Sequence, residues 1–307
     1  MPRALVTGGA GFVGRHLASF LAAKGCDIWS LDRRAGGPAG ATVIEADLLE
    51  PEAADRAVAE SLPDFVVHLA ARTPANAPGG SAADWLGGDP VATHHLLDAI
   101  RTRAPLARVL VVSSSAVYGN VPANRLPIAE SSPLQPTTLY GVAKAAVELV
   151  ALRFYVTFGL HVTRVRPFNL VGPGEPASML TSTLAVQVAR IVSGDCAAVV
   201  RMRHRATSRD YVDVRDAVRA YWLALERGVP GEAYNVCSGR CTEIGLLAER
   251  LLSVAGASAA VEETDPAPAP GDIAVQSGDG TKLAAATGWV PEIPLDESLR
   301  DLLASIV

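Results

Sequence analysis

The chain has 307 residues, of which 49% are hydrophobic and 19% charged, a composition typical of a globular protein rather than a disordered one. Its 27 lysines and arginines against 32 aspartates and glutamates leave a net charge of -5, so no overall positive field favours binding to nucleic acid. No apolar run approaches the roughly 18 residues of a membrane span, and the N-terminus has no signal-peptide pattern. We therefore expect a soluble cytoplasmic protein without a membrane partner.

Apolar runs of β type alternate with helical patterns through the first half of the chain. Runs such as DFVVHLA and RVLVVSS are continuously apolar, as is typical of strands buried on both faces of a parallel sheet. Their alternation with helices predicts βαβ crossovers and a doubly wound α/β sheet of the Rossmann type. The predicted strands are 4–7, 27–31, 42–46, 65–70, 108–113 and 161–166, and the predicted helices are 12–24, 52–61, 82–103 and 138–158.

The sequence changes character after residue 166. RPFNLVGPGEP is rich in glycine and proline, as loops are, and further helical patterns follow it. We expect a Rossmann domain over residues 1–166 and a smaller C-terminal lobe over 167–307, with some segments returning to the first domain. The later predicted helices are 179–194, 214–228 and 242–256.

The segment LVTGGAGFVG, residues 5–14, ends the first predicted strand and opens the first predicted helix. Glycines at 8, 11 and 14 fit G-x-x-G-x-x-G, and Gly9 with the last two fits G-x-G-x-x-G. Glycines here permit a tight turn and close helix–strand packing, while free N–H groups at the helix start favour an anionic diphosphate. The sequence thus predicts a dinucleotide site with contacts from Gly8, Gly11, Phe12, Val13 and Gly14.

Asp32 ends the segment DIWSLD, directly after the second predicted strand, at about the spacing of 20 positions that this fingerprint requires. A carboxylate there binds the adenosine ribose hydroxyls and repels a 2′-phosphate, which favours NAD over NADP. Arg33 follows directly, and an arginine would suit NADP, so both cofactors stay open with NAD favoured. Further cofactor contacts are predicted at the ends of the third and fourth strands, from Asp47, Leu48, Leu69, Ala70 and Ala71.

TTLYGVAKAAVEL places Tyr140 and Lys144 four residues apart on a predicted helix, so both side chains lie on one face. A neighbouring ammonium favours the phenolate and lowers the tyrosine pKa from about 10. Such a tyrosine can exchange a proton with a sugar oxygen near neutral pH, although a chance surface pair is the alternative. The serines that end VLVVSSS can supply a hydroxyl to the same substrate oxygen.

Taken in order, GGAGFVG, Asp32, HLAA, SSSAVYG, YGVAK, RPFNLVGPG, RDYVDV and YNVCSG resemble the motifs of the extended short-chain dehydrogenase/reductases. This family includes nucleotide-sugar epimerases, dehydratases and reductases, and the resemblance runs from about residue 3 to the final helix. It implies that Ser114, four residues before Tyr118, is a catalytic hydroxyl beside Tyr140 and Lys144. It also implies cofactor contacts from Tyr140, Lys144 and Pro167, and a nucleotide-diphosphate sugar substrate bound by Ser115, Asn169 and Arg209.

The resemblance separates three activities within the family. Ser115 and Ala116 stand where 4,6-dehydratases typically carry an Asp–Glu pair, which argues against a dehydratase. The C-terminal segments look most like the GDP-4-keto-6-deoxy-mannose reductase branch, which has dTDP-sugar relatives. This implies NAD(P)H-dependent reduction of the C4 ketone of a nucleotide-linked 4-keto-6-deoxyhexose in deoxysugar biosynthesis, with Tyr140 as proton donor. A nucleotide-sugar 4-epimerase that retains NAD is the alternative, and a non-catalytic, redox-sensing dinucleotide binder is a third reading.

Relatives dimerise through the helix that carries Tyr140 and the helix before it, which implies a homodimer formed by 82–103 and 138–158. Asp89, in the first of these helices, stands where many relatives have an asparagine. His68 and the pair His94-His95 lack carboxylate or cysteine partners at ligand spacing, and the four cysteines show no metal or disulfide pattern. We therefore expect no metal site.

Overall fold

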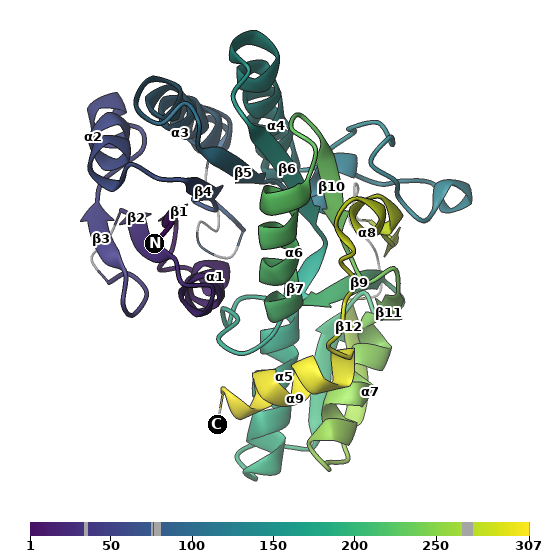
Figure 1. Cartoon of the computed structure of the whole chain (residues 1–307). Helices are drawn as coiled ribbons and strands as arrows, with labels where there is room; N and C mark the ends of the chain where they lie inside the picture. The colour runs from purple at the N-terminus through teal and green to yellow at the C-terminus, as the bar shows by residue number, and fades with distance from the viewer. Residues whose placement is uncertain (34–35, 75, 77–80, 266–272, 307) are drawn as a thin grey trace.

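The computed structural model describes residues 1–33, 36–74, 76, 81–265 and 273–306. A parallel β-sheet lies at its centre (Figure 1). Its seven strands lie in the order β10-β6-β5-β4-β1-β2-β3, and every neighbouring pair is parallel. The direction of winding reverses between β1 and β4, as in doubly wound folds that bind dinucleotides there. This confirms the predicted fold class. The strands are β1 (Arg3–Thr7), β2 (Asp27–Asp32), β3 (Thr42–Glu45), β4 (Phe65–His68), β5 (Arg108–Val112), β6 (Val162–Pro167) and β10 (Ala233–Val236).

Helices cover both faces of this sheet. Alternate residues of β1 enter different hydrophobic clusters: Val6 packs with the helices on one face and Leu5 with those on the other. This explains the continuously apolar strand sequences, because each strand has two buried faces. One face carries α1 (Phe12–Ala23) and α6 (Val214–Arg227), and the other carries α2 (Pro51–Ser61), α3 (Ala82–Arg103) and α4 (Leu139–Phe158).

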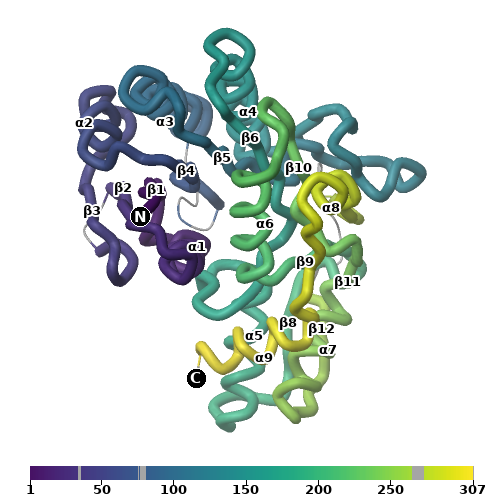
Figure 2. Tube along the Cα trace, viewed as in Figure 1, coloured from purple at the N-terminus to yellow at the C-terminus, as the bar shows by residue number. Residues whose placement is uncertain are grey.

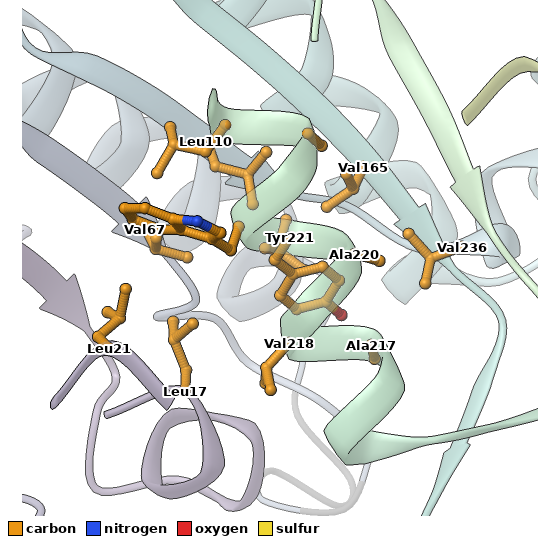
Figure 3. Packing of buried hydrophobic residues seen from close by; sticks show 14 of the residues in the cluster. Leu17, Leu21, Val67, Leu110, Val165, Ala217, Val218, Ala220, Tyr221 and Val236 are labelled. Atoms are coloured by element: carbon orange, nitrogen blue, oxygen red, sulfur yellow. The ribbon is translucent and has the colours of Figure 1, made fainter. Parts of the chain in front are cut away.

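Helix α6 fills the space between α1 and the sheet edge (Figure 3). Tyr221 and Val218 of this helix face the strand residues Val67 and Leu110, and Leu17 of α1 closes the same cluster. Burial of one such side chain stabilises the fold by roughly 1.5–3 kcal/mol relative to leaving it exposed. This packing holds α1 and α6 against β4 and β5.

A second, smaller layer of structure lies below the sheet, as the trace in Figure 2 shows. Its central strand is β9 (Ser208–Asp213), which pairs with β7 (Asn169–Val171), β11 (Cys241–Glu243) and β13 (Val275–Gln276). A pair of strands, β8 (Val199–Arg203) and β12 (Ala260–Asp265), lies beside it. The remaining elements are α5 (Leu180–Val192), α7 (Ile244–Val254), α8 (Thr281–Thr287), α9 (Leu295–Ala304) and the 3-10 turns η1 (Ser115–Tyr118) and η2 (Ala123–Arg125).

The predicted elements appear with ends shifted by a few residues. Strand β4 ends at His68 rather than at residue 70, although the Leu69 nitrogen still bonds the Thr7 carbonyl at 3.1 Å. The sequence did not predict β10, which follows α6 in the chain and joins the large sheet beside β6. Among the described residues, no helix combines the length and apolar character that a membrane crossing requires.

Candidate active site

The glycine-rich loop lies between β1 and α1, at the carboxyl end of the parallel strands. A Cβ atom on Gly8, whose φ is +74°, would lie 3.0 Å from the backbone nitrogen and Cα of Ala70. A Cβ atom on Gly14 would lie 2.4 Å from the carbonyl oxygen of Gly8. The loop is therefore pressed against the segment after β4 and against its own helix, as the fingerprint predicts.

The first turn of α1 is open to an anion. Gly11 is the N-cap, and neither a side-chain cap nor an acidic residue occupies the first turn. The N–H groups at a helix start have no partner within the helix and carry a partial positive charge. The residues from Gly11 to Gly14 thus fit a dinucleotide diphosphate.

Asp32 braces this loop from the end of β2. Its carboxylate is 8% exposed and accepts hydrogen bonds from the Ala10 nitrogen at 3.1 and 3.3 Å and from the Ser30 hydroxyl at 2.6 Å. The predicted ribose ligand therefore also holds the backbone of the glycine loop. Arg33 is exposed beside it.

The other predicted cofactor contacts lie along the same edge of the sheet. The Asp47 carboxylate accepts from the Leu49 nitrogen at 3.0 Å, and the buried Leu48 accepts at its carbonyl from His95 Nδ1 at 2.9 Å. The Ala70 nitrogen donates to the Thr7 hydroxyl at 3.1 Å, which holds the half-buried segment Leu69–Ala71 over β1. Pro167 ends β6.

Helix α4 and the end of β5 bring the three predicted catalytic residues together. The Ser114 and Tyr140 hydroxyls share a hydrogen bond. Lys144, one turn along the same helix face, donates from Nζ to the Val112 carbonyl at 3.0 Å. Thr138 caps the helix through its hydroxyl, which accepts from the Gly141 nitrogen at 3.0 Å and fixes where the helix begins.

Desolvation is the largest influence on the pKa values of Tyr140 and Lys144. Desolvation raises the pKa of Tyr140, the hydrogen bond with Ser114 partly lowers it, and the Asp89 carboxylate raises it. The expectation of a lowered tyrosine pKa was therefore wrong in direction, since enclosure outweighs the favourable contacts. Burial lowers the pKa of Lys144, while the carboxylates of Asp89 and Glu148 raise it. A phenol with a raised pKa stays protonated at neutral pH and can donate a proton.

Helix α3 closes one side of the group. The Trp85 ring packs edge-on against the Tyr140 ring, with centroids 6.0 Å apart. The Asp89 carboxylate is buried and accepts from the Arg72 nitrogen at 3.0 and 3.1 Å. Burial raises the pKa of Asp89, and the Lys144 ammonium lowers it. The sequence signalled this residue only as a departure from relatives.

His68 belongs to the frame of the site. Its ring nitrogens bond the hydroxyls of Thr7 at 2.7 Å and Thr93 at 3.0 Å, and burial lowers its pKa to about 3. The ring is therefore neutral and joins β1 to α3. Within the described parts of the chain, no three His, Cys, Asp or Glu side chains gather as metal ligands would.

Two predicted substrate residues, Asn169 and Arg209, lie on the neighbouring strands β7 and β9, and Ser115 is the first residue of the turn η1. The Asn169 amide donates to the Asp210 carbonyl at 3.1 Å, and Arg209 on β9 donates to its Ser208 neighbour at 2.9 Å. Gln276 of β13 pairs with Arg209 and donates to the Ser115 carbonyl at 3.2 Å. These bonds bring Ser115, Asn169 and Arg209 to one region beside the catalytic group.

Sequence reasoning missed three buried charges that support the site. Asp210 accepts from the backbone nitrogens of Ser238, Gly239 and Gly278 at 2.7, 2.9 and 3.2 Å, and thereby gathers two loops. Glu148 follows Lys144 by one turn, and Arg166 binds it. The only sequence signals were the charges within YGVAKAAVE, RPFN and RDYVDV, whose partners are distant in the chain.

Comparison with known proteins adds a family and relatives. The profile of the NAD dependent epimerase/dehydratase family matches residues 4–237. GDP-6-deoxy-D-mannose reductase of Pseudomonas aeruginosa is 35% identical over 98% of this chain and 96% of its own length.

Two solved structures show the same fold. RMD from Pseudomonas aeruginosa complexed with NADPH has a TM-score of 0.87 and 34% identity, with 99% of both chains covered. UDP-glucose 4-epimerase of Thermus thermophilus in complex with NAD has a TM-score of 0.84 and 28% identity, with 99% of this chain and 98% of the other covered. This chain is thus similar to a structure complexed with NADPH and to a UDP-glucose 4-epimerase in complex with NAD.

Proposed function

Because the chain belongs to the NAD dependent epimerase/dehydratase family, we propose that it reduces the C4 ketone of a nucleotide-linked 4-keto-6-deoxyhexose with NAD(P)H. The observation that carries the proposal is the half-buried Ser114–Tyr140 hydrogen bond, one helical turn from the buried Lys144. Ser115 and Ala116 supply no carboxylate pair for removal of water. Similarity to GDP-6-deoxy-D-mannose reductase supports the same reading.

The residues of the glycine loop and of the strand ends fit an NAD(P) cofactor. The open first turn of α1 would hold the diphosphate, and Asp32 would hold the adenosine ribose. When bound, NAD(P)H supplies the hydride that adds to the carbonyl carbon. Asp32 favours NAD, whereas the neighbouring Arg33 offers a cation to a 2′-phosphate.

Tyr140 acts as the proton donor. Charge develops on the C4 oxygen as the ketone is reduced, and the Tyr140 hydroxyl transfers its proton to that oxygen while Ser114 donates a hydrogen bond. One hydride and one proton convert the ketone to a secondary alcohol and leave a phenolate. The Ser114 hydroxyl and the Lys144 ammonium stabilise this phenolate until solvent returns the proton.

The lobe over residues 167–307 mainly binds the substrate in this proposal. Arg209 offers a planar guanidinium that suits the sugar-nucleotide diphosphate by bidentate geometry. Asn169 lies on the neighbouring strand, and Ser115 faces the sugar from the turn after β5. Asn169 and Arg209 thus orient the diphosphate, and Ser115 the ring.

A nucleotide-sugar 4-epimerase is the second candidate, favoured by the similarity to UDP-glucose 4-epimerase in complex with NAD. The two activities differ in how they use the cofactor. A reductase consumes one reduced dinucleotide per turnover, whereas an epimerase retains its dinucleotide and needs none added.

The test follows the absorbance of NADH, and separately of NADPH, on mixing the protein with dTDP- or GDP-4-keto-6-deoxyhexose. Stoichiometric loss of one reduced cofactor supports the reductase, provided that Tyr140→Phe lowers the rate by about 10²–10⁴-fold. No loss with either ketosugar, together with tightly bound NAD and interconversion of UDP-glucose and UDP-galactose, would establish the epimerase instead.

A further inference from the structure

A buried ion pair lies one turn further along the helix face that carries Tyr140 and Lys144. Glu148 follows Tyr140 and Lys144 at the same spacing on α4, and its side chain has no exposed surface. Arg166 of β6 donates hydrogen bonds to both Glu148 carboxylate oxygens, from Nε at 2.8 Å and from Nη2 at 2.7 Å. Such a two-bond contact fixes the direction of both side chains, which a single bond does not.

The same guanidinium holds the turn that carries Ser114. Arg166 Nη1 donates to the Tyr118 hydroxyl at 2.9 Å, and its guanidinium carbon lies 5.0 Å from the centre of the Tyr118 ring. Tyr118 is the last residue of η1, and Ser114 is the N-cap of that turn. Arg166 therefore contacts the two elements that supply the Ser114–Tyr140 hydrogen bond.

Asn235 anchors the far side of this arrangement. The Tyr118 hydroxyl donates to Asn235 Oδ1 at 2.7 Å, and the Asn235 amide donates to the carbonyls of Ile128 at 2.8 Å and Asp279 at 3.2 Å. The Tyr118 hydroxyl thus has both a donor and an acceptor partner, and its position is fully determined. Polar groups that are buried and fully bonded in this way specify a single arrangement.

We propose that Arg166, bonded to Glu148 and Tyr118, is a positioning residue that sets the Ser114 hydroxyl against the Tyr140 phenol. Without it, α4 and η1 would keep their packing and the Ser114–Tyr140 bond but would lose the contact that fixes the geometry of that bond. Displacements well below 1 Å matter when two groups act on one atom. The inference rests on the proposed function only where it assigns both hydroxyls to one substrate oxygen.

Tyr118→Phe is the decisive variant. It keeps the ring and the Arg166–Glu148 pair but removes the hydroxyl that joins the pair to η1. Tyr234→Phe is the matched control, because Tyr234 is equally buried, precedes Asn235 and loses one hydroxyl bond, that from the Val229 nitrogen at 3.0 Å. Arg166→Lys keeps the charge without the two-bond geometry, and Arg103→Lys makes the same change at the Arg103–Asp55 pair on α3 and α2.

Two readouts are measured on the full chain. The first is ketosugar reduction, in which Tyr118→Phe and Arg166→Lys lower kcat by at least about tenfold with KM within about twofold. The second is ultraviolet titration of the Tyr140 phenol, taken as the difference from Tyr140→Phe in each background. Because the bond with Ser114 lowers the pKa of Tyr140, Tyr118→Phe raises that pKa, in the same direction as Ser114→Ala does.

The outcomes separate this inference from the proposed function. If the unmodified protein reduces no ketosugar, the function fails and the titration still decides the role of Arg166. An unchanged Tyr140 pKa in Tyr118→Phe overturns the inference, as does an equal loss of kcat in Tyr118→Phe and Tyr234→Phe. If Arg166→Lys does not fold, Tyr118→Phe decides alone.

Discussion

The Arg72 backbone nitrogen donates to both carboxylate oxygens of Asp89, at 3.0 and 3.1 Å. This contact joins α3 to the segment that follows β4, where the cofactor is expected to lie. The carboxylate raises the pKa of both Tyr140 and Lys144. An asparagine retains an acceptor oxygen for Arg72, so the charge of Asp89 can be removed without losing the contact.

Asp89→Asn should move the alkaline limb of the kcat–pH profile to lower pH. Removing the negative charge favours the phenolate, so the pKa of Tyr140 falls, and a proton donor with a lower pKa loses its proton earlier as pH rises. The measurement is kcat of ketosugar reduction against pH. Asp98→Asn is the control, because Asp98 lies on the same helix with its side chain 47% exposed. A limb that stays or moves upward contradicts the prediction.

Gly14→Ala should weaken dinucleotide binding by at least about tenfold and destabilise the fold by about 1–3 kcal/mol. The added Cβ would lie 2.4 Å from the Gly8 carbonyl oxygen and 2.5 Å from Gly9 Cα, so the loop must shift. Gly87→Ala is the control, because a Cβ there meets nothing within 4 Å. Binding is measured by isothermal titration calorimetry with NADH and NADPH. Equal affinity of the two variants would refute the close-packing argument.

Asp32→Asn should raise the ratio of kcat/KM for NADPH to that for NADH by roughly tenfold. Loss of the negative charge removes the repulsion of a 2′-phosphate, which Arg33 can then bind. The amide oxygen still accepts from the Ala10 nitrogen, so the loop keeps its brace. Steady-state kinetics with both cofactors measure the ratio, and Asp32→Asn, Arg33→Ala is the control that should return it toward the original value.

Glu175→Gln should remove a pH dependence of stability. Burial raises the pKa of Glu175 from its ordinary value of 4.5 to about 7, although the Thr181 hydroxyl partly opposes the shift. Between those two values the folded state binds more protons than the unfolded state, so the free energy of unfolding falls as pH rises from 4.5 to 7. The total effect is at most about 3 kcal/mol. Urea unfolding at pH 5 and pH 8 measures this change in the free energy of unfolding. An equal change in the unmodified protein and in Glu175→Gln would contradict the raised pKa of Glu175.

We propose that the chain forms a homodimer through α3 and α4. Leu149 and Val156 of α4 are 62% and 71% exposed, and together with Val142 they repeat every seven residues along one helix face. Leu149→Asp, Val156→Asp should convert a dimer to a monomer in analytical ultracentrifugation. Val192→Asp, Val229→Asp changes two exposed valines elsewhere and should leave the mass unchanged. A monomeric unmodified protein would disprove the interface.

The fold and much of the candidate site follow from local patterns. The continuously apolar strands, the spacing of Gly8, Gly11 and Gly14, and the four-residue step from Tyr140 to Lys144 each express a rule that acts over a few residues. These patterns were sufficient to predict the parallel sheet and to bring together the residues of α4 and the end of β5.

What the sequence did not predict depends on contacts between distant residues. Tyr118 and Asn235 are 117 positions apart, and Arg166 finds Glu148 only when β6 lies beside α4. The direction of the Tyr140 pKa failed for a related reason, since the degree of enclosure depends on Trp85 and the rest of α3 rather than on the helix that carries the tyrosine. Hydrophobic periodicity predicts which face of a helix or strand is buried, but it does not predict which distant charged residue contacts that face.

The late position of β10 in the chain has a consequence for synthesis. The edge strand β10 and helix α6, which shares one face of the sheet with α1, come from residues 214–236. They follow β7, α5, β8 and β9 of the smaller layer in the chain. A ribosome that has released only the first 167 residues therefore presents an apolar sheet with one face covered only by α1 and with an open edge at β6. Such a nascent chain needs protection from neighbouring chains until residue 236 has emerged.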